Sequence, residues 1–212
     1  MEQGAPRRRA EAVTDGRRAR GLRRRAEIIE ATLRVVQRDG AGGVTHRTVA
    51  READVPTSLT AYYFATLDDL LVAALSTVAD EYTRRLHEIV ESDGDDLDGL
   101  AALVASAGGD GRGRALAERE LSTLAARRPA LRPVARRWRD AVARIGERHT
   151  SDPRAVDALV AATDGLCADI LLTDAGPDVR RIRAVLAHSL RPVDGDRRPA
   201  RPRAGGTRRP PA

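Results

Sequence analysis

The chain has 212 residues, of which 42% are hydrophobic but only 2% aromatic, and its formal net charge is +6. A single cysteine excludes an internal disulfide, no apolar run approaches the roughly 20 residues that a membrane-spanning helix needs, and the charged N-terminus lacks the apolar core of a signal peptide. We therefore expect a cytoplasmic protein without a membrane segment, large enough for one compact domain and a smaller second one.

The positive charge is concentrated at the two ends of the sequence. Residues 1–25 contain nine arginines and three acidic residues, and residues 192–212 contain six arginines and two acidic residues. The intervening body is therefore mildly acidic, with a net charge of −4. Neither end shows an apolar periodicity that could form a core, so we expect residues 1–21 and 192–212 to be disordered.

Apolar residues recur at helical spacing through the rest of the chain. A first helix runs from about Leu22 to Gly40, and a long helix begins at a capping box formed by Thr66 and Asp69 and ends near residue 91. Five further helical patterns follow, over residues 100–107, 116–124, 131–145, 156–170 and 179–190. No segment alternates with the period of two that is typical of strands, so the sequence predicts an all-α fold of about nine helices.

Two short polar helices between the first helix and the long one form the most informative segment. Thr45 can cap the first of them, and Val49 would lie on its buried face. Pro56 prevents that helix from continuing, and Thr57 can cap a second short helix that runs through Phe64. Three of the chain's five aromatic residues lie together at the end of this second helix. A helix, a tight turn and a second helix that presents hydroxyls are typical of a chain that reads a DNA groove.

Residues 23–71 resemble the N-terminal domain of the tetracycline-repressor-like (TetR) family of transcriptional regulators. The resemblance rests on the end of the first helix and on a gap-free pattern of about 27 residues after it. The matching residues are Gly40, Thr45, Val49, Ala50, Ala53, Val55, Tyr62, Tyr63, Phe64, Asp69, Leu70 and Leu71. The resemblance implies a three-helix DNA-binding domain, here residues 22–66, and a larger helical domain, here residues 67–191, that binds effectors and dimerises.

The resemblance also implies which side chains face DNA. The groove-facing set would be Thr57, Ser58, Leu59, Ala61 and Tyr62, with Arg47 and Tyr63 nearer the phosphate backbone. Hydroxyls can donate to bases or phosphates, and small apolar groups can touch a thymine methyl. Ordinary helix packing is the alternative for each residue, above all for Leu59 and Tyr63. The arginine-rich N-terminal arm would add contacts to the DNA backbone or the minor groove.

Three positions depart from the family pattern. Asp54 stands where the family usually has a glycine at the turn between the two short helices, and such a turn commonly needs a positive φ. Leu67 stands where members often direct a lysine at a phosphate. Pro56 stands where a serine is usual, which would move the cap of the second short helix to Thr57.

In the larger domain, Asp164, Gly165 and Leu166 resemble an element of the family's penultimate helix, which pairs with the last helix across a dimer. Gly165 would allow close packing there, with a merely tolerated interior glycine as the alternative. The resemblance therefore implies a homodimer through the last two helices and a palindromic operator in double-stranded DNA.

An effector pocket would lie among the helices between residues 78 and 145. Its candidate polar contacts are Tyr82, Glu120, Thr123 and Trp138, and a purely structural role is the alternative for each. The chain is so poor in aromatic residues that aliphatic effectors are favoured over flat aromatic ones. Cys167 lies on an apolar stripe and is expected to behave as a small buried hydrophobic residue.

We expect a sequence-specific DNA-binding transcriptional regulator, a repressor that an unknown small-molecule effector releases from DNA. No catalytic residue, metal site or cofactor is expected, because the four histidines are scattered singly and no nucleophile elbow or phosphate loop occurs. The alternative is a helical protein–protein adaptor with a degenerate helix-turn-helix. Asp54, Leu67 and the near-neutral charge of the predicted DNA-binding domain favour this alternative.

Overall fold

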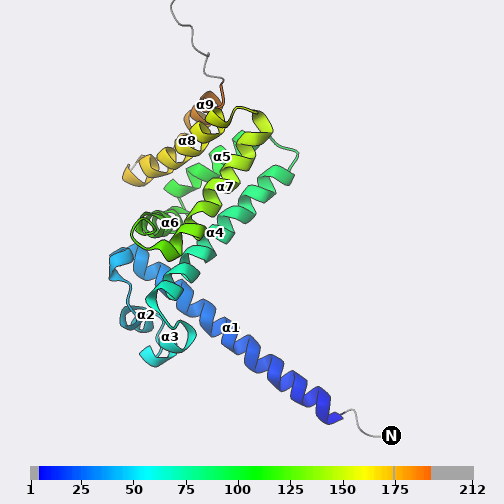
Figure 1. The fold of residues 1–212 in the computed structure, drawn as a ribbon, viewed down its shortest axis with the longest axis vertical. Helices are drawn as coiled ribbons and strands as arrows, with labels where there is room; N and C mark the ends of the chain where they lie inside the picture. The colour runs from blue at the N-terminus through cyan, green and yellow to red at the C-terminus, as the bar shows by residue number, and fades with distance from the viewer. Residues whose placement is uncertain (1–4, 174, 192–212) are drawn as a thin grey trace, which may run out of the picture.

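The computed structural model describes residues 5–173 and 175–191, and within those ranges it consists of helices without any strand (Figure 1). Nine α-helices form this described part: α1 (Ala5–Asp39), α2 (His46–Glu52), α3 (Thr57–Tyr63), α4 (Leu67–Glu91), α5 (Asp96–Ala105), α6 (Arg112–Leu124), α7 (Arg132–His149), α8 (Pro153–Leu172) and α9 (Val179–Ser189). Three single-turn 3-10 helices lie between them: η1 (Ala41–Gly43), η2 (Ser106–Gly108) and η3 (Pro129–Leu131). The predicted all-α fold is confirmed, and the C-terminal tail at 192–212 lies outside the described residues.

The N-terminal segment differs from its prediction, because α1 begins at Ala5 and not near Leu22. The expectation of a disordered arm at residues 1–21 is therefore wrong from Ala5 onward, while residues 1–4 lie outside the described part. The physical reason is that alanine, arginine and glutamate have high helix propensities, so a helix nucleated in the buried part of α1 can extend without a core of its own. Figure 1 shows this half of α1, in blue, projecting away from the other helices.

The first three helices pack around an apolar centre that they share with the body of the protein. Ile28, Leu33 and Val36 on α1 are at most 1% exposed, as is Leu71 on α4. The same buried cluster includes Leu121 on α6. The core therefore runs across the predicted domain boundary at residue 66, and α1 rests directly on α4 and α6.

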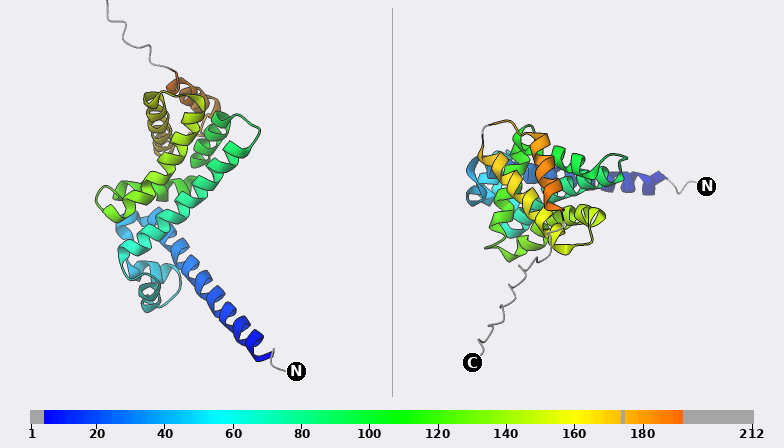
Figure 2. Two further views of the ribbon diagram at one scale, coloured as in Figure 1. Left: turned by 45° about the vertical axis from the view of Figure 1, so that its right-hand side comes forward. Right: turned by 90° about the horizontal axis from the view of Figure 1, so that it is seen from above.

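α4 connects the two ends of the molecule. Its predicted capping box is present: the Thr66 hydroxyl accepts from the Asp69 amide at 3.1 Å, and the Asp69 carboxylate accepts from the Thr66 amide at 2.9 Å. α4 packs along α7 (Figure 2), and Asp80 on α4 pairs with Arg137 on α7. Figure 1 shows α2 and α3 at one end of this pair and α8 and α9 at the other.

A second apolar cluster fills the end of the molecule that carries α5, α8 and α9. Its buried members include Leu86, Leu100, Val142, Ile145, Leu159 and Leu186. These residues belong to the helical stripes that the sequence predicted, because a helix brings residues three and four apart onto one face. Among the described helices, none lies against the outer faces of α8 and α9 (Figure 2).

The turn between α2 and α3 has the conformation that the sequence predicted. Asp54 has a φ of 52°, the positive value expected at this position. The Val55 amide donates to the Ala50 carbonyl at 2.9 Å, and the Asp54 amide donates to the Arg51 carbonyl at 3.3 Å. These two bonds form a Schellman motif, in which the residue after the helix takes the left-handed conformation that glycine adopts most easily.

Replacing Asp54 with glycine is expected to raise the free energy of unfolding by about 0.5–1 kcal/mol, because glycine adopts a positive φ without a clash at Cβ. Thermal unfolding followed by circular dichroism should show a melting temperature about 1–4 °C higher. Asp54→Ala is the control, and it should lower the melting temperature, since alanine tolerates a positive φ poorly. An unchanged or lowered melting temperature for Asp54→Gly would refute this prediction.

Candidate nucleic-acid interface and effector cavity

α3 is fixed to its neighbours by the side chains on its inner face. Thr60 is fully buried, and its hydroxyl donates to the Thr57 carbonyl at 2.8 Å and lies 3.3 Å from Nδ1 of His46 on α2. Phe64, directly after α3, is 2% exposed, and the guanidinium carbon of Arg25 on α1 lies 4.9 Å from the centre of its ring. α3 is thus held by α2 and α1, and its opposite side faces solvent as a rigid surface.

Most of the predicted groove-facing residues lie on that outer side. Thr57, Ser58 and Ala61 are exposed, and Tyr62 is 79% exposed. A tyrosine combines an apolar ring with a hydroxyl, which suits it to a phosphate or a base edge. Arg47 on α2 is exposed as well. This end of the molecule therefore presents hydroxyls, a methyl group, an aromatic ring and a guanidinium to a partner.

Two members of the predicted set are less accessible. Tyr63 is half-buried: its ring meets that of Tyr62 edge-on with centroids 5.2 Å apart, and its hydroxyl lies beside Gly21 on α1. Leu59 is half-buried too. For both residues packing competes with a DNA contact, which is the alternative that the sequence left open.

The cap of α3 differs from its prediction. Pro56 holds the N-cap position, with φ −60° and ψ 142°, and Thr57 is the first residue of the helix. The Pro56 carbonyl accepts the Leu59 amide at 2.9 Å, so the helix starts one residue earlier than a Thr57 cap would allow. The expected cap role of Thr57 is wrong, and the start of α3 has no side-chain capping bond.

Some of the charged residues on α1 and α2 form ion pairs with one another. Arg34 and Arg38 hold the Glu52 carboxylate at 2.8 and 2.7 Å, and these bonds, Arg38 first, keep the pKa of Glu52 below its usual range. Leu67, where a lysine is usual, is partly buried against the core around α1. Exposed arginines that could meet phosphates occur on α1, at Arg18, Arg20 and Arg23.

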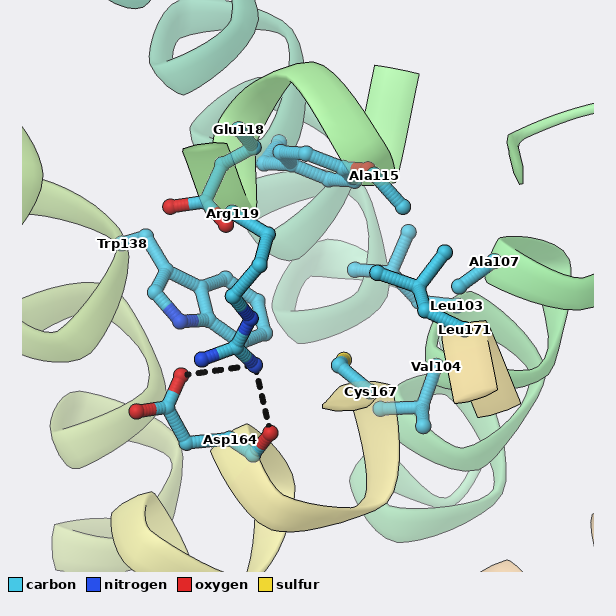
Figure 3. A pocket seen from close by; sticks show the side chains of 11 residues that line it. Leu103, Val104, Ala107, Ala115, Glu118, Arg119, Trp138, Asp164, Cys167 and Leu171 are labelled. Carbon is cyan, nitrogen blue, oxygen red and sulfur yellow. Dashed lines mark hydrogen bonds and ion pairs between the residues drawn. The ribbon is translucent and has the colours of Figure 1, made fainter. Parts of the chain in front are cut away.

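A small cavity lies in the other half of the molecule, between α4, α5, α6, α7 and α8 (Figure 3). Its volume of about 30 Å³ has room for little more than ordered water, whereas a drug-sized ligand needs about 300–1,000 Å³. Leu103, Val104 and Leu171 form part of its apolar wall. Two aromatic rings, Tyr82 and Trp138, line it with their centroids 5.9 Å apart.

The four predicted effector contacts fall in different places. Tyr82 and Trp138 line the cavity, and Thr123 lines an adjoining cleft. Glu120 is exposed, and its carboxylate accepts from the Ala41 amide of η1 at 3.4 Å. Residues two apart on a helix point in nearly opposite directions, so α6 directs Glu118 into the cavity wall while Glu120 faces the N-terminal helices.

Sequence reasoning missed Glu118, Arg119 and Asp164, which supply the polar groups of the cavity wall. The signal that could have found Glu118 is its spacing of three residues from both Ala115 and Leu121, which are buried on α6. An acidic residue on such a stripe faces inward.

An open cleft of about 290 Å³ adjoins the cavity. Glu118, Arg119, Trp138 and Asp164 line both spaces and form the partition between them. The Arg119 guanidinium reaches from α6 to Asp164 on α8, where it donates to the carbonyl at 2.7 Å and lies 3.6 Å from the carboxylate (Figure 3). Arg139 on α7 donates to the other oxygen of that carboxylate at 2.6 Å.

Burial controls the charge of the groups in this wall. It raises the pKa of Glu118 above its ordinary value, although a 2.5 Å hydrogen bond from the Ser122 hydroxyl and the charge of Arg119 oppose the shift. Burial also raises the pKa of Cys167 to about 12, so the thiol stays protonated at neutral pH. A negative charge inside the cavity is therefore unfavourable unless a cation accompanies it.

No group of three or more histidine, cysteine, aspartate or glutamate side chains among the described residues could hold a metal ion. No single described helix is long and apolar enough to cross a membrane, and α3 and α4 meet that criterion only together, with a bend of 74° between them.

Comparison with known proteins identifies a family model and curated relatives that this chain resembles. Residues 91–192 match the model described as tetracyclin repressor-like, C-terminal domain. The HTH-type transcriptional regulator PksA of Bacillus subtilis (strain 168) is 37% identical over 71 residues, and the HTH-type transcriptional regulator BetI of Burkholderia lata is 36% identical over 84 residues. These matches cover 34% and 39% of this chain and 35% and 43% of the relatives, so the chain spans less than half the length of each.

Solved structures are similar over most of the chain. The structure of a member of the TetR family (SCO1917) from Streptomyces coelicolor A3 is 43% identical, with a TM-score of 0.71, over 80% of this chain and 99% of that one. The multidrug binding protein EbrR complexed with ethidium is 43% identical, with a TM-score of 0.66, over the same shares of the two chains. EbrR has also been solved with imidazole, malachite green and proflavin.

Proposed function

The chain belongs to the TetR family, given its 43% identity to SCO1917 across 99% of that protein, and we propose that it is a homodimeric repressor that leaves its operator when a small molecule binds. It is a helix-turn-helix transcriptional regulator and not an enzyme, like the regulators that it resembles. The observation that carries the proposal is the outer side of α3, where Tyr62 is 79% exposed on a helix fixed by the buried Thr60 and Phe64.

In this proposal α3 is the reading helix and lies in the major groove of double-stranded DNA. Thr57, Ser58 and Tyr62 offer hydroxyls to bases and phosphates, Ala61 offers a methyl group, and Arg47 on α2 meets the backbone. Leu59 and Tyr63 lie at the rim of this contact. An α-helix with its side chains is about 10–12 Å wide and the minor groove about 6 Å, so the helical arm of α1 favours contacts to the backbone over the minor groove.

Dimerisation through α8 and α9 is supported by the outer side of these helices. Leu172 at the end of α8 is 86% exposed, and Val185 on α9 is 37% exposed. Gly165 is exposed, and nothing lies within 4 Å of the place that its Cβ would occupy, so a partner helix could approach closely there. A twofold dimer sets two copies of α3 on successive major grooves, about 34–36 Å apart, and so selects a palindromic operator.

Release from DNA requires a connection between the cavity and α3, and both α4 and α6 supply one. α4 carries Tyr82 in the cavity wall, and only three residues separate its start from the end of α3. α6 carries Glu118 in the wall and contacts α1 through Arg114, whose Nη2 lies 2.8 Å from a carboxylate oxygen of Glu30. A ligand that widens the cavity moves these helices. The ligand thereby favours a conformation of the dimer in which the spacing of the two α3 helices no longer matches the spacing of the major grooves.

The effector is a small molecule with an aromatic part. EbrR, which is similar to this chain, binds several such compounds, and Tyr82 and Trp138 place two of this chain's five aromatic residues in one cavity. This arrangement outweighs the preference for aliphatic effectors that overall composition suggested. A repressor acts where its operator is, so we place the protein in the cytoplasm.

The experiment that tests this function is binding to the DNA upstream of the protein's own gene at about 150 mM salt, followed by fluorescence anisotropy. A repressor should bind one segment with a Kd of about 10 nM or tighter, and at least about a thousandfold more tightly than scrambled DNA. A protein–protein adaptor with a degenerate helix-turn-helix, favoured by Asp54 and Leu67, would show only weak, sequence-independent binding that collapses as the salt concentration rises.

A further inference from the structure

Glu118 is an acidic residue of the cavity wall that forms no ion pair with any of the described residues. Among the described residues its carboxylate has one hydrogen-bond partner, the Ser122 hydroxyl at 2.5 Å. The two nearby guanidinium groups, Arg119 and Arg139, are directed at Asp164. Because a carboxylate in largely apolar surroundings is costly unless it is paired, Glu118 is the group that an incoming positive charge would complement.

Two aromatic rings lie in the same wall as this carboxylate. Tyr82 and Trp138 are 5.9 Å apart between centroids and are inclined to each other by 56°. The face of an aromatic ring attracts a cation within about 6 Å, and the attraction strengthens where water is excluded. A carboxyl group beside two rings therefore suits an organic ammonium ion or a delocalised aromatic cation, and it disfavours an anion.

A ligand cannot fill this space unless Arg119 moves. The cavity of about 30 Å³ and the cleft of about 290 Å³ are separated by the side chains of Glu118, Arg119, Trp138 and Asp164. Nε of Arg119 is buried and has no hydrogen-bond partner in the described part of the chain, so the guanidinium is held from one side, by Asp164. A cation that approaches Glu118 repels this like-charged group toward the cleft and joins the two spaces.

We propose that the cavity is a binding site for organic cations, in which Glu118 is the counter-charge and the contact between Arg119 and Asp164 is a gate that the ligand opens. This inference rests on the proposed function, because it names the chemical class of the effector that releases the repressor. Neutral and anionic compounds of the same shape bind less tightly at this site.

The pH dependence of binding follows from the groups that face Glu118. These are Tyr82 from α4, Arg119 from α6, Arg139 from α7, and Asp164 and Cys167 from α8. In the free protein burial raises the pKa of Glu118 above the ordinary 4.5, and a bound cation lowers it again by favouring the carboxylate. Cation affinity should therefore rise with pH between the lower pKa of Glu118 in the complex and its raised pKa in the free protein, with a proton released on binding inside that window, and should level off once the free carboxyl group is ionised.

Trp138 is the only tryptophan in the sequence and lines the cavity, so its fluorescence reports ligand binding directly. Titration of the full chain with trimethylphenylammonium, a permanent cation, and with tert-butylbenzene, its neutral isostere, isolates the effect of charge. The cation should bind at least about tenfold more tightly than the isostere. Glu118→Gln should weaken cation binding about tenfold and leave the affinity for the isostere unchanged.

Glu120→Gln is the matched control, because it makes the same chemical change two residues along α6 and outside the cavity. This variant should keep the cation preference. Arg119→Met, which retains length without charge, should tighten cation binding. If Glu118→Gln does not fold, the unaltered protein still gives a test: cation affinity should rise with pH while isostere affinity stays flat.

Equal affinities of the unaltered protein for the cation and its isostere would overturn the proposal, and so would a cation preference that survives Glu118→Gln or is lost in Glu120→Gln. The titration contains no DNA. A failure to bind an operator would therefore contradict the proposed repressor function and leave the result at this site standing.

Discussion

Tyr62→Ala is expected to lower operator affinity by about a hundredfold and to leave the melting temperature unchanged. The loss of a specific contact costs about 1–3 kcal/mol, and a twofold dimer loses one contact in each half-site. Tyr62 is 79% exposed, so its removal costs the folded protomer little packing. Fluorescence anisotropy on the operator at fixed salt measures the affinity, and circular dichroism measures the melting temperature.

Two variants make this result specific. Tyr62→Phe keeps the ring and removes the hydroxyl, so the difference between Tyr62→Phe and Tyr62→Ala measures what the ring contributes. Arg84→Ala removes an exposed side chain of α4, away from α3, and should leave operator affinity unchanged. If Tyr62→Ala binds the operator normally, the outer side of α3 is not the reading surface.

Gly165→Arg should convert the dimer to a monomer and lower operator affinity by about 100-fold or more, because each reading helix would then bind without the other. The Cβ position at Gly165 meets nothing within 4 Å, so a larger side chain fits the protomer and disturbs only a partner. Sedimentation equilibrium measures the oligomeric state, and anisotropy on the operator measures the affinity.

The control for this substitution is His87→Arg, which places the same side chain at an exposed position of α4. Gly165→Ala supplies a second comparison: alanine should stabilise α8 by up to about 1 kcal/mol, since glycine is the weaker helix former. A Gly165→Arg protein that stays dimeric at micromolar concentration would exclude this part of α8 from the interface.

Features decided by neighbouring residues could be predicted from the sequence. The capping box of Thr66 and Asp69 is one example, because both of its bonds join groups three residues apart. The positive φ of Asp54 is another, because the turn after α2 needs a left-handed residue whatever packs around it. The helical stripes were predictable for the same reason, since periodicity alone shows which face is buried.

Features decided by competition between local options were predicted less well. Thr57 and Pro56 both fit the N-cap of α3, and the backbone bond from Leu59 to Pro56 favours the earlier start. The arm lacks a core, which is typical of disorder, but its helix-forming residues continue α1 from Ala5. In both cases the sequence shows which residues are present, but it does not show which of the two competing local structures is more stable.

The proposed effector cavity was the hardest part to predict, because its wall is assembled from five helices far apart in the sequence. Tyr82 and Trp138 could be chosen as polar groups on apolar stripes. The choice between Glu118 and Glu120 depends on the rotation of α6 against α1, which tertiary packing sets. The contact of Arg119 with Asp164 joins residues 45 positions apart and has no local signal.

Hydroxyl-radical footprinting on the upstream DNA tests most directly whether paired α3 helices read a palindrome. We expect two protected patches related by a twofold axis, with centres about 34–36 Å apart along the duplex, and their loss in Tyr62→Ala. A single patch without symmetry, or equal protection of every sequence offered, would contradict a dimeric reader built on α3.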